Sequence, residues 1–178
     1  MLVSPDKETP VSITEQLLRE FDFEFPATRK FLTLIPDDKL GWKPHEKSMQ
    51  LGRLAWHLSD FASWATDVIV KDNLLFNAEE LPKMAGLWKD KDRAAILARF
   101  DTDVKIARGC LATAREEAWE QRWTMGTGEE NWVDEPRIDV YRKMVISHQA
   151  HHRAQLGVYY RLNGIPIPGV YGPSADES

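Results

Sequence analysis

Hydrophobic positions recur at three- and four-residue spacing along four stretches of the chain, a pattern typical of amphipathic helices. These stretches cover roughly residues 12–34, 49–71, 90–120 and 136–163. Little of the strict alternation that indicates strands lies between them. Four amphipathic helices, each about 20 to 30 residues long, predict an all-α protein built as a four-helix bundle.

Several residues predict where these helices begin, end or bend. Ser12 and Glu15 have the spacing of a capping box, and Ser48 is placed to cap the second helix. Gly164 suits the left-handed position that follows a helix end. Pro26 lies inside the first apolar pattern, so we expect a kink or a break there.

The connecting segments are polar or rich in Gly and Pro. They cover residues 36–47, 73–89 and 121–135, and the last two are long for links between helices. We expect these two to hold short irregular elements that cover one end of the core. Residues 165–178 form a Pro/Gly-rich tail, and no composition shift divides the chain, so residues 1–178 are predicted to form a single domain.

Composition and charge exclude several classes of protein. A chain of 178 residues with 43% hydrophobic and 29% charged residues is ordinary for a globular domain and not for a disordered one. The longest uncharged run, Leu162–Ala175, contains three prolines, so it is not a membrane span. Met1–Pro10 lacks the apolar segment of a secretory signal, which makes the cytoplasm the expected location.

Cysteine count and net charge narrow the chemistry further. Cys110 is the only cysteine, which excludes an intrachain disulfide and a cysteine-based zinc cluster. The formal net charge of −5, without a basic run, argues against nucleic acid as a partner.

Two histidines of the fourth helix carry the strongest chemical signal. His148 and His152 are four residues apart, so both lie on one face and could chelate one metal ion. They belong to a seam with four- and three-residue steps that we expect to face the core: Tyr141, Val145, His148, His152, Gln155, Tyr159 and Leu162. His151 lies about 100° round the helix and is expected to face outward.

His57, among apolar residues of the second helix, is the candidate third ligand. Neutral imidazole suits Zn²⁺, Ni²⁺, Fe²⁺ or Cu²⁺, and three protein ligands leave positions for water or substrate. Periodicity alone does not bring His57 to the pair, and all three could instead be hydrogen-bonded core histidines. His45 lies in a Pro-containing loop and is a weaker candidate.

Other candidates also have structural alternatives, and for Asp60 the solvated carboxylate is the favoured one. Asp60 either orients a ligand or is a solvated carboxylate, and Gln155 either bonds a metal-bound water or is a buried amide. Cys110 is placed as a packed thiol rather than a nucleophile. Six tryptophans are expected in the core and the covering loops, with some lining a pocket: Trp56, Trp64, Trp88, Trp119, Trp123 and Trp132.

Three segments resemble the DinB/YfiT-like superfamily. The block Ser147–Gln155 is similar to the signature of its last helix, with Ala154 where Gly is usual. Residues 42–44 with the helix around His57, and the tail from Gly164 to Glu177, are similar to other segments of that family.

The resemblance implies a four-helix bundle of up-down-down-up order and often a homodimer. It implies a divalent metal, nickel or zinc, on His57, His148 and His152. It also implies S-transfer or isomerisation with a low-molecular-weight thiol such as bacillithiol or mycothiol, or metal-dependent hydrolysis.

The leading hypothesis from the sequence is a metal-dependent enzyme that acts on a small-molecule substrate with a small thiol, of the S-transferase type. Neither Glu-x-x-His nor His-Glu-x-x-His occurs, so no general base stands beside the ligands to activate water. The alternatives are a metal-dependent hydrolase and a protein that binds metal or a ligand without catalysis.

Overall fold

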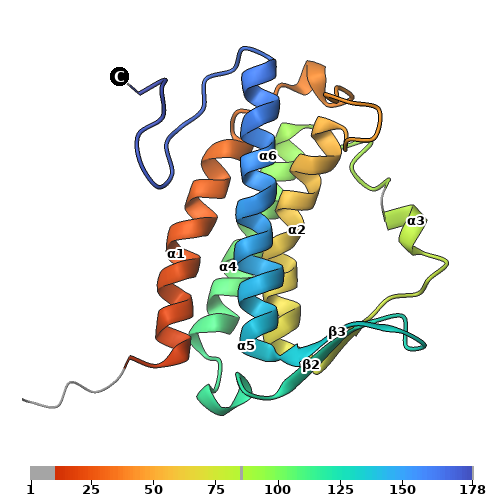
Figure 1. Cartoon of the computed structure of the whole chain (residues 1–178), viewed down its shortest axis with the longest axis vertical. Coiled ribbons are helices and arrows are strands. Elements are labelled where there is room, and N and C mark those ends of the chain that lie inside the picture. The colour runs from red at the N-terminus through yellow and green to blue at the C-terminus, as the bar shows by residue number, and fades with distance from the viewer. Residues whose placement is uncertain (1–10, 85, 178) are drawn as a thin grey trace, which may run out of the picture.

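The computed structural model describes residues 11–84 and 86–177. The segment examined for a secretory signal, residues 1–10, lies outside the described residues. Within them, four long helices form the bundle: α1 (Ile13–Leu32), α2 (Leu51–Val70), α4 (Arg93–Ala112) and α6 (His148–Leu162). In Figure 1, α1 rises, α2 and α4 descend and α6 rises again, which confirms the up-down-down-up order.

The long link between α2 and α4 makes this order possible. It returns from the lower end of α2 to the upper end of α4, and it contains strand β1 (Asn73–Leu75) and the short helix α3 (Leu81–Met84). Short elements were expected in this link and are found. None of the described helices is long and apolar enough to cross a bilayer.

A small sheet closes the lower end of the bundle, where the sequence pattern indicated almost no strand. Strand β2 (Arg122–Gly126) pairs antiparallel with β3 (Asn131–Pro136) and parallel with β1. Burial of Trp123 and Met125 on one side of β2 holds the sheet against the bundle. At the end of β2, a Cβ added to Gly126 would come within 1.9 Å of the Glu130 carbonyl oxygen, so glycine is required there.

The third helix is shorter than expected from the pattern over 90–120. It ends at Ala112, and a short 3₁₀ turn (Glu116–Ala118) follows. This turn directs Trp119 into the core, where its indole N–H donates to the Thr14 hydroxyl over 2.8 Å. The Glu116 carboxylate accepts the backbone N–H groups of Ile13 and Thr14, which occupies free donors at the start of α1.

The fourth predicted helix is continuous but has three parts. Helix α5 (Arg137–Val140) leads into a π-helical segment (Tyr141–Ser147), and α6 follows without a gap. Gly164 has a φ of 70° just beyond its end, as predicted. The π-helical segment widens the helix directly before His148, and such segments are frequent at functional sites.

The structure excludes a break at Pro26 and a cap at Ser48. Helix α1 runs unbroken through Pro26, which is exposed together with Asp22, so the carbonyl group that Pro26 leaves unpaired faces solvent. The residue before α2 is Gln50, not Ser48, and its side chain makes no capping hydrogen bond. At α1 the Ser12 hydroxyl does accept the Glu15 N–H over 3.1 Å, as the capping-box spacing predicts.

The core lies between the four long helices and above the sheet. Aromatic side chains dominate it; the largest that are almost fully buried are Trp119, Trp123, Tyr141, Tyr160, Phe21, Phe25, Phe61 and Phe100. Among them, Phe61 of α2 lies 4.9 Å from the His148 ring and 6.1 Å from the His152 ring between centroids, so it packs between the two helices that carry the histidines.

Candidate metal centre

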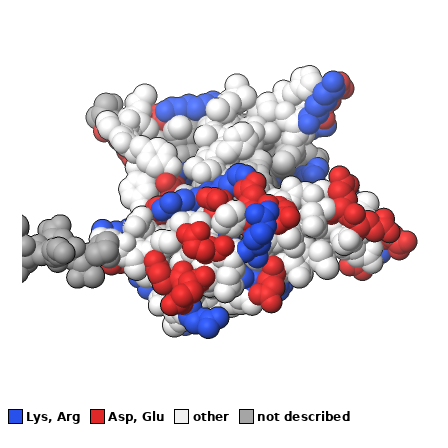
Figure 2. Space-filling model, turned by 60° about the horizontal axis from the view of Figure 1, so that its bottom comes forward, with Lys and Arg blue, Asp and Glu red and all other residues white. Residues whose placement is uncertain are grey.

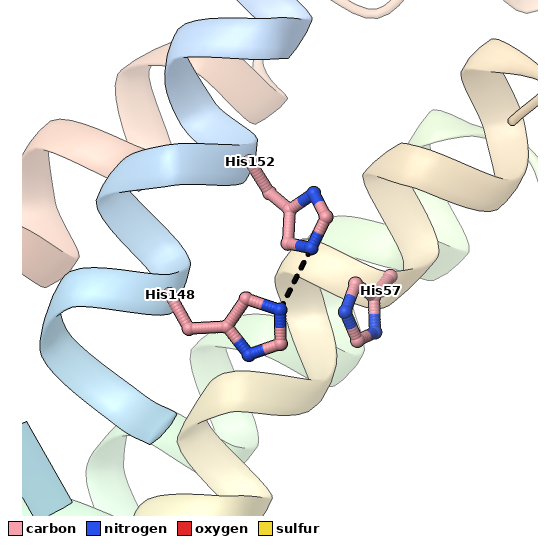
Figure 3. Close-up of side chains that lie close together, drawn as sticks. All are labelled: His57, His148 and His152. Atoms are coloured by element: carbon pink, nitrogen blue, oxygen red, sulfur yellow. Dashed lines mark hydrogen bonds between the residues drawn. The ribbon is translucent and has the colours of Figure 1, made fainter. Parts of the chain in front are cut away.

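The structure brings His57, His148 and His152 together. His57 comes from α2 and the other two from the start of α6 (Figure 3). The ring of His57 lies 5.4 Å from that of His148 and 4.7 Å from that of His152, measured between centroids. One nitrogen of each ring lies within 4.8 Å of the others. His57 of α2 therefore contacts the two histidines of α6, which the periodicity of the sequence could not predict.

The Nε2 atoms of His148 and His152 face each other at 2.9 Å. The other ring nitrogen of His152, Nδ1, lies 2.7 Å from the amide oxygen of Gln155. An amide oxygen only accepts, so Nδ1 carries the proton of the neutral ring and donates it to Gln155. The Nε2 atom of His152 is therefore left with a lone pair directed toward His148.

His148 supplies the partner of that lone pair. Its Nδ1 atom is buried and faces the carbonyl group of Met144 without reaching hydrogen-bond geometry with any described residue. The 2.9 Å contact between the two Nε2 atoms is a hydrogen bond, so the Nε2–H of His148 donates to the lone pair of His152. A metal ion that took both Nε2 atoms as ligands would displace this proton.

His57 is held from the side away from the pair. Its Nδ1 atom lies 3.7 Å from the Asp60 carboxylate, an electrostatic contact longer than a hydrogen bond. Figure 3 shows the other ring nitrogen directed toward His148 and His152. The second oxygen of Asp60 pairs with Arg99 at 2.6 Å. Asp60 thus orients His57, and Arg99 holds the carboxylate in place.

Burial keeps the two α6 histidines neutral. It lowers the pKa of His152 to about 4, with the Gln155 hydrogen bond opposing and the neighbouring histidines adding to the shift. Burial and the nearby His57 also lower the pKa of His148 below its ordinary value. Neutral imidazole is the form that ligates a metal.

The donor set fits a divalent transition metal. Two nitrogens bound to a tetrahedral zinc ion at about 2.0–2.1 Å each lie about 3.3 Å apart. The observed nitrogen separations bracket that value, from 2.9 Å to at most 4.8 Å. Gln155 behind His152 and Asp60 beside His57 are the kinds of partner found next to metal-bound histidines. The group could therefore hold a metal ion.

A cavity of about 310 Å³ lies beside the histidines. His57 and Asp60 form part of its wall, and Arg53 is its one Lys or Arg among the described residues. The rest of its wall is apolar: Met49, Trp56, Trp64, Phe76, Leu81, Met84, Trp88, Met125 and Trp132. The α2–α4 link and the sheet therefore provide one side of the cavity and α2 the other.

The remaining sequence candidates divide clearly. His45 is exposed in its loop and accepts the Lys47 N–H, far from any shared site. His151 faces outward as predicted, where its ring nitrogen meets the Gln155 amide nitrogen at 3.0 Å. Of the two roles considered for Gln155, the structure shows the amide that is hydrogen-bonded to a neighbour, His152. Cys110 lies partly buried on α4 and is not part of the histidine group.

The tryptophans divide between core and cavity. Trp119 and Trp123 are core residues, whereas Trp56, Trp64, Trp88 and Trp132 line the cavity. Sequence reasoning missed Arg53, although its position one helical turn before His57 was a usable signal. It also missed Arg99, because nothing local in the sequence pairs it with Asp60.

Comparison with known proteins places this geometry in a family. YrdA of Bacillus subtilis strain 168 is 29% identical over 170 residues, covering 92% of this chain and 90% of YrdA. A DinB-like protein of Bacillus cereus ATCC 10987 has a similar structure, with a TM-score of 0.65 at 20% identity, covering 92% of this chain and 100% of that one.

A second solved structure shares the fold. YfiT of Bacillus subtilis, described as a probable metal-dependent hydrolase with an unusual four-helix bundle topology, matches with a TM-score of 0.65 at 13% identity. The match covers 92% of this chain and 95% of YfiT. The model of the DinB family matches residues 5–178, and the chain therefore belongs to the DinB family.

Proposed function

We propose that this protein is a metal-dependent enzyme that joins a small thiol to an electrophilic substrate, with His57, His148 and His152 as the metal ligands. The observation that supports the proposal most is the convergence of three imidazoles, one nitrogen of each within 4.8 Å of the others, beside a largely apolar cavity. Three nitrogen donors without cysteine or a free carboxylate suit Zn²⁺ or Ni²⁺.

A divalent ion held there would supply Lewis acidity, lowering the pKa of a thiol or, in a hydrolase, of water. Gln155 and Asp60 keep the imidazoles of His152 and His57 turned toward the site. The tryptophans and methionines of the cavity exclude water from the reacting groups, which strengthens the attraction between charges there.

The state of Asp60 favours a thiol over water as the nucleophile. It is the one carboxylate among the described residues of the cavity wall, and Arg99 pairs with it at 2.6 Å. One oxygen of Asp60 pairs with Arg99 and the other faces His57, so neither is directed at a nucleophile in the cavity. Water needs a base more than a thiol does, because a thiol has the lower pKa and is the stronger nucleophile.

The direct test uses full-length protein loaded with Zn²⁺ or Ni²⁺. Low-molecular-weight thiols are supplied one at a time with 1-chloro-2,4-dinitrobenzene, and conjugate formation is followed by absorbance. We expect metal-dependent conjugation that is lost in His152→Ala and kept in His151→Ala, a matched change at the adjacent, outward-facing histidine.

Hydrolysis is the second candidate, supported by the shared fold with YfiT. Metal-dependent cleavage of a chromogenic ester, without conjugation of any thiol, would replace the transferase with the hydrolase. Metal binding without turnover in either assay would indicate a protein that binds metal or a ligand without catalysis.

We further propose that duplex DNA is not a partner. The net charge is −5, and Figure 2 shows basic and acidic side chains interspersed on the face drawn, without a broad basic area. A cytoplasmic location and a homodimer stay predictions.

A further inference from the structure

The wall of the cavity contains one cation that the metal centre does not use. Arg53 lies on α2 and lines the cavity, and its side chain forms no ion pair or hydrogen bond with any described residue. Every other charged or titratable group of the wall has a partner: Asp60 pairs with Arg99, and His57 faces Asp60. The positive charge of Arg53 is therefore available to a ligand.

Arg99, the nearby arginine that pairs with Asp60, has a guanidinium group that is occupied by partners within the protein. It lies 4.2 Å from the centre of the Trp56 ring and also approaches Asp103 at 3.5 Å. These contacts leave it as a support behind the wall. Arg53 has none of them, although it projects from the same helix face as His57.

The position of Arg53 sets a distance from the histidines. Residues four apart on a helix have Cβ atoms about 5–6 Å from each other, so Arg53 lies one turn from His57 along the cavity wall. A ligand with its reacting atom at the histidines and a negative group at Arg53 would lie along this turn. Flat aromatic rings line the cavity, and among them Trp56 follows Arg53 by three residues on the same helix.

We propose that the cavity binds a small molecule with a flat apolar body and one carboxylate, and that Arg53 pairs with that carboxylate. A cavity of about 310 Å³ admits a body of modest size. Guanidinium groups bind carboxylates through two parallel hydrogen bonds, which fixes orientation as well as affinity. The inference deepens the proposed function by naming the substrate class, and it rests on that function only in placing the reacting atom at the histidines.

The test measures binding of two probes that share one body, 4-phenylbutanoate and its uncharged analogue 4-phenylbutanamide. The four cavity tryptophans report binding by their fluorescence, with calorimetry as a second readout. The full chain is titrated both loaded with Zn²⁺ and after chelation. We expect the wild type to bind the carboxylate about tenfold more tightly than the amide, the gain of a charge-assisted hydrogen bond.

Arg53→Gln should weaken the carboxylate about tenfold and leave the amide unchanged. Arg53→Lys should keep part of the preference, because it keeps the charge without the planar fork. The matched control is Arg19→Gln on α1, an exposed arginine far from the cavity that pairs with Glu15. It should behave as wild type. Thermal unfolding of all variants checks that they fold alike.

Three results would overturn the proposal. Equal binding of the two probes to the wild type is one, and no saturable binding of either is another. The third is a carboxylate preference that survives Arg53→Gln and disappears on chelation, which would place the carboxylate on the metal. Selective binding without metal-dependent conjugation would instead leave this site in place and contradict the transferase.

Discussion

His152 and Arg153 are consecutive residues at the start of α6, both almost fully buried, and they solve the problem of burial in opposite ways. The guanidinium of Arg153 donates to the Glu24 carboxylate and carbonyl group, to the Thr28 hydroxyl and to the Tyr171 hydroxyl. Tyr171 in turn donates to the other Glu24 oxygen, which ties the tail to α1. The positive charge of Arg153 is therefore neutralised inside the protein by Glu24.

His152 satisfies one nitrogen with Gln155 and leaves the other directed at His148. A buried polar group whose partners come from other elements of the fold is evidence of a structural role, whereas imidazoles that converge and bond to one another are evidence of a site. This difference in hydrogen-bond partners distinguishes His152 from Arg153, although the two are adjacent on one helix and similarly buried. Changes at the two residues should therefore have different consequences.

The largest effect is expected from removing a ligand. His148→Ala should reduce bound Zn²⁺ or Ni²⁺ from near stoichiometric to background, because two imidazoles remain on an otherwise apolar wall. His151→Ala should keep the metal, since His151 faces outward. Metal content by mass spectrometry after dialysis measures both. Equal loss in the two variants would show that the ligand assignment is wrong.

Arg153→Ala should affect stability instead. It leaves the Glu24 charge buried without its partner, which costs about 3–5 kcal/mol in the free energy of unfolding. Arg161→Ala, an exposed arginine of the same helix that pairs with Asp176, should cost at most about 1 kcal/mol. Urea unfolding compares the two variants. If Arg153→Ala fails to fold, the double variant Arg153→Met with Glu24→Leu removes both charges and should recover stability.

Metal content separates this variant from the ligand variants. The folded Arg153 variant should bind metal as the wild type does, since no Arg153 contact reaches the histidines. A loss of stability below about 1 kcal/mol would contradict a structural role for the buried pair.

Gln155 belongs to both sides of this comparison, because it is a hydrogen-bond partner of His152, a proposed ligand. Gln155→Ala should weaken metal affinity about 10–100-fold, the usual effect of losing the group that orients a metal-bound histidine. Gln155→Glu keeps an acceptor for the His152 Nδ1–H and should retain most of the affinity. Competition with a chromogenic chelator gives the affinities. Unchanged affinity in Gln155→Ala would mean that its hydrogen bond does not position the ligand.

The sequence predicted those parts of the molecule that depend on local periodicity. The four long helices and the inward-facing pair on α6 follow from three- and four-residue spacing. The third histidine does not, because whether α2 presents His57 to α6 depends on packing between helices 90 residues apart in the chain; the family resemblance supplied it. The role of Gln155 was recognised only as one of two alternatives.

Long-range contacts decided what was missed. The expected third helix continued past Ala112 because the apolar spacing continues, but Trp119 bonds to Thr14 on α1 and pulls the chain away. Strand β2 has two buried side chains, and its parallel partner β1 lies some 50 residues earlier, so no local pattern shows the sheet. The seam predicted on the last helix is buried at Tyr141, Val145, His152 and Tyr159 and fails only at its last member, where α6 ends. Leu162, expected inward, is 60% exposed.

The smallest expected effect concerns the end of the C-terminal tail. Like Arg153, the carboxylates there have a structural role, but they lie at the surface. The Asp176 carboxylate accepts the Ile167 N–H and pairs with Arg161, and both contacts lower its pKa below the ordinary 3.8. The Glu177 carboxylate accepts the N–H groups of Ser174 and Gly169, which lower its pKa below the ordinary 4.5.

Groups with a lowered pKa in the folded state stabilise it fully above their ordinary pKa, and the stabilisation is lost as the pH falls through the lowered value. The tail should therefore be fully attached above pH 4.5 and should loosen at more acidic pH, while the Arg153 contacts still hold Tyr171. Hydrogen exchange of residues 165–177 between pH 6 and pH 3, corrected for intrinsic rates and referred to α4, measures this. Asp176→Asn with Glu177→Gln should show the loosened tail already at neutral pH. Protection of the tail that stays constant across the range would contradict an attachment that depends on these two carboxylates.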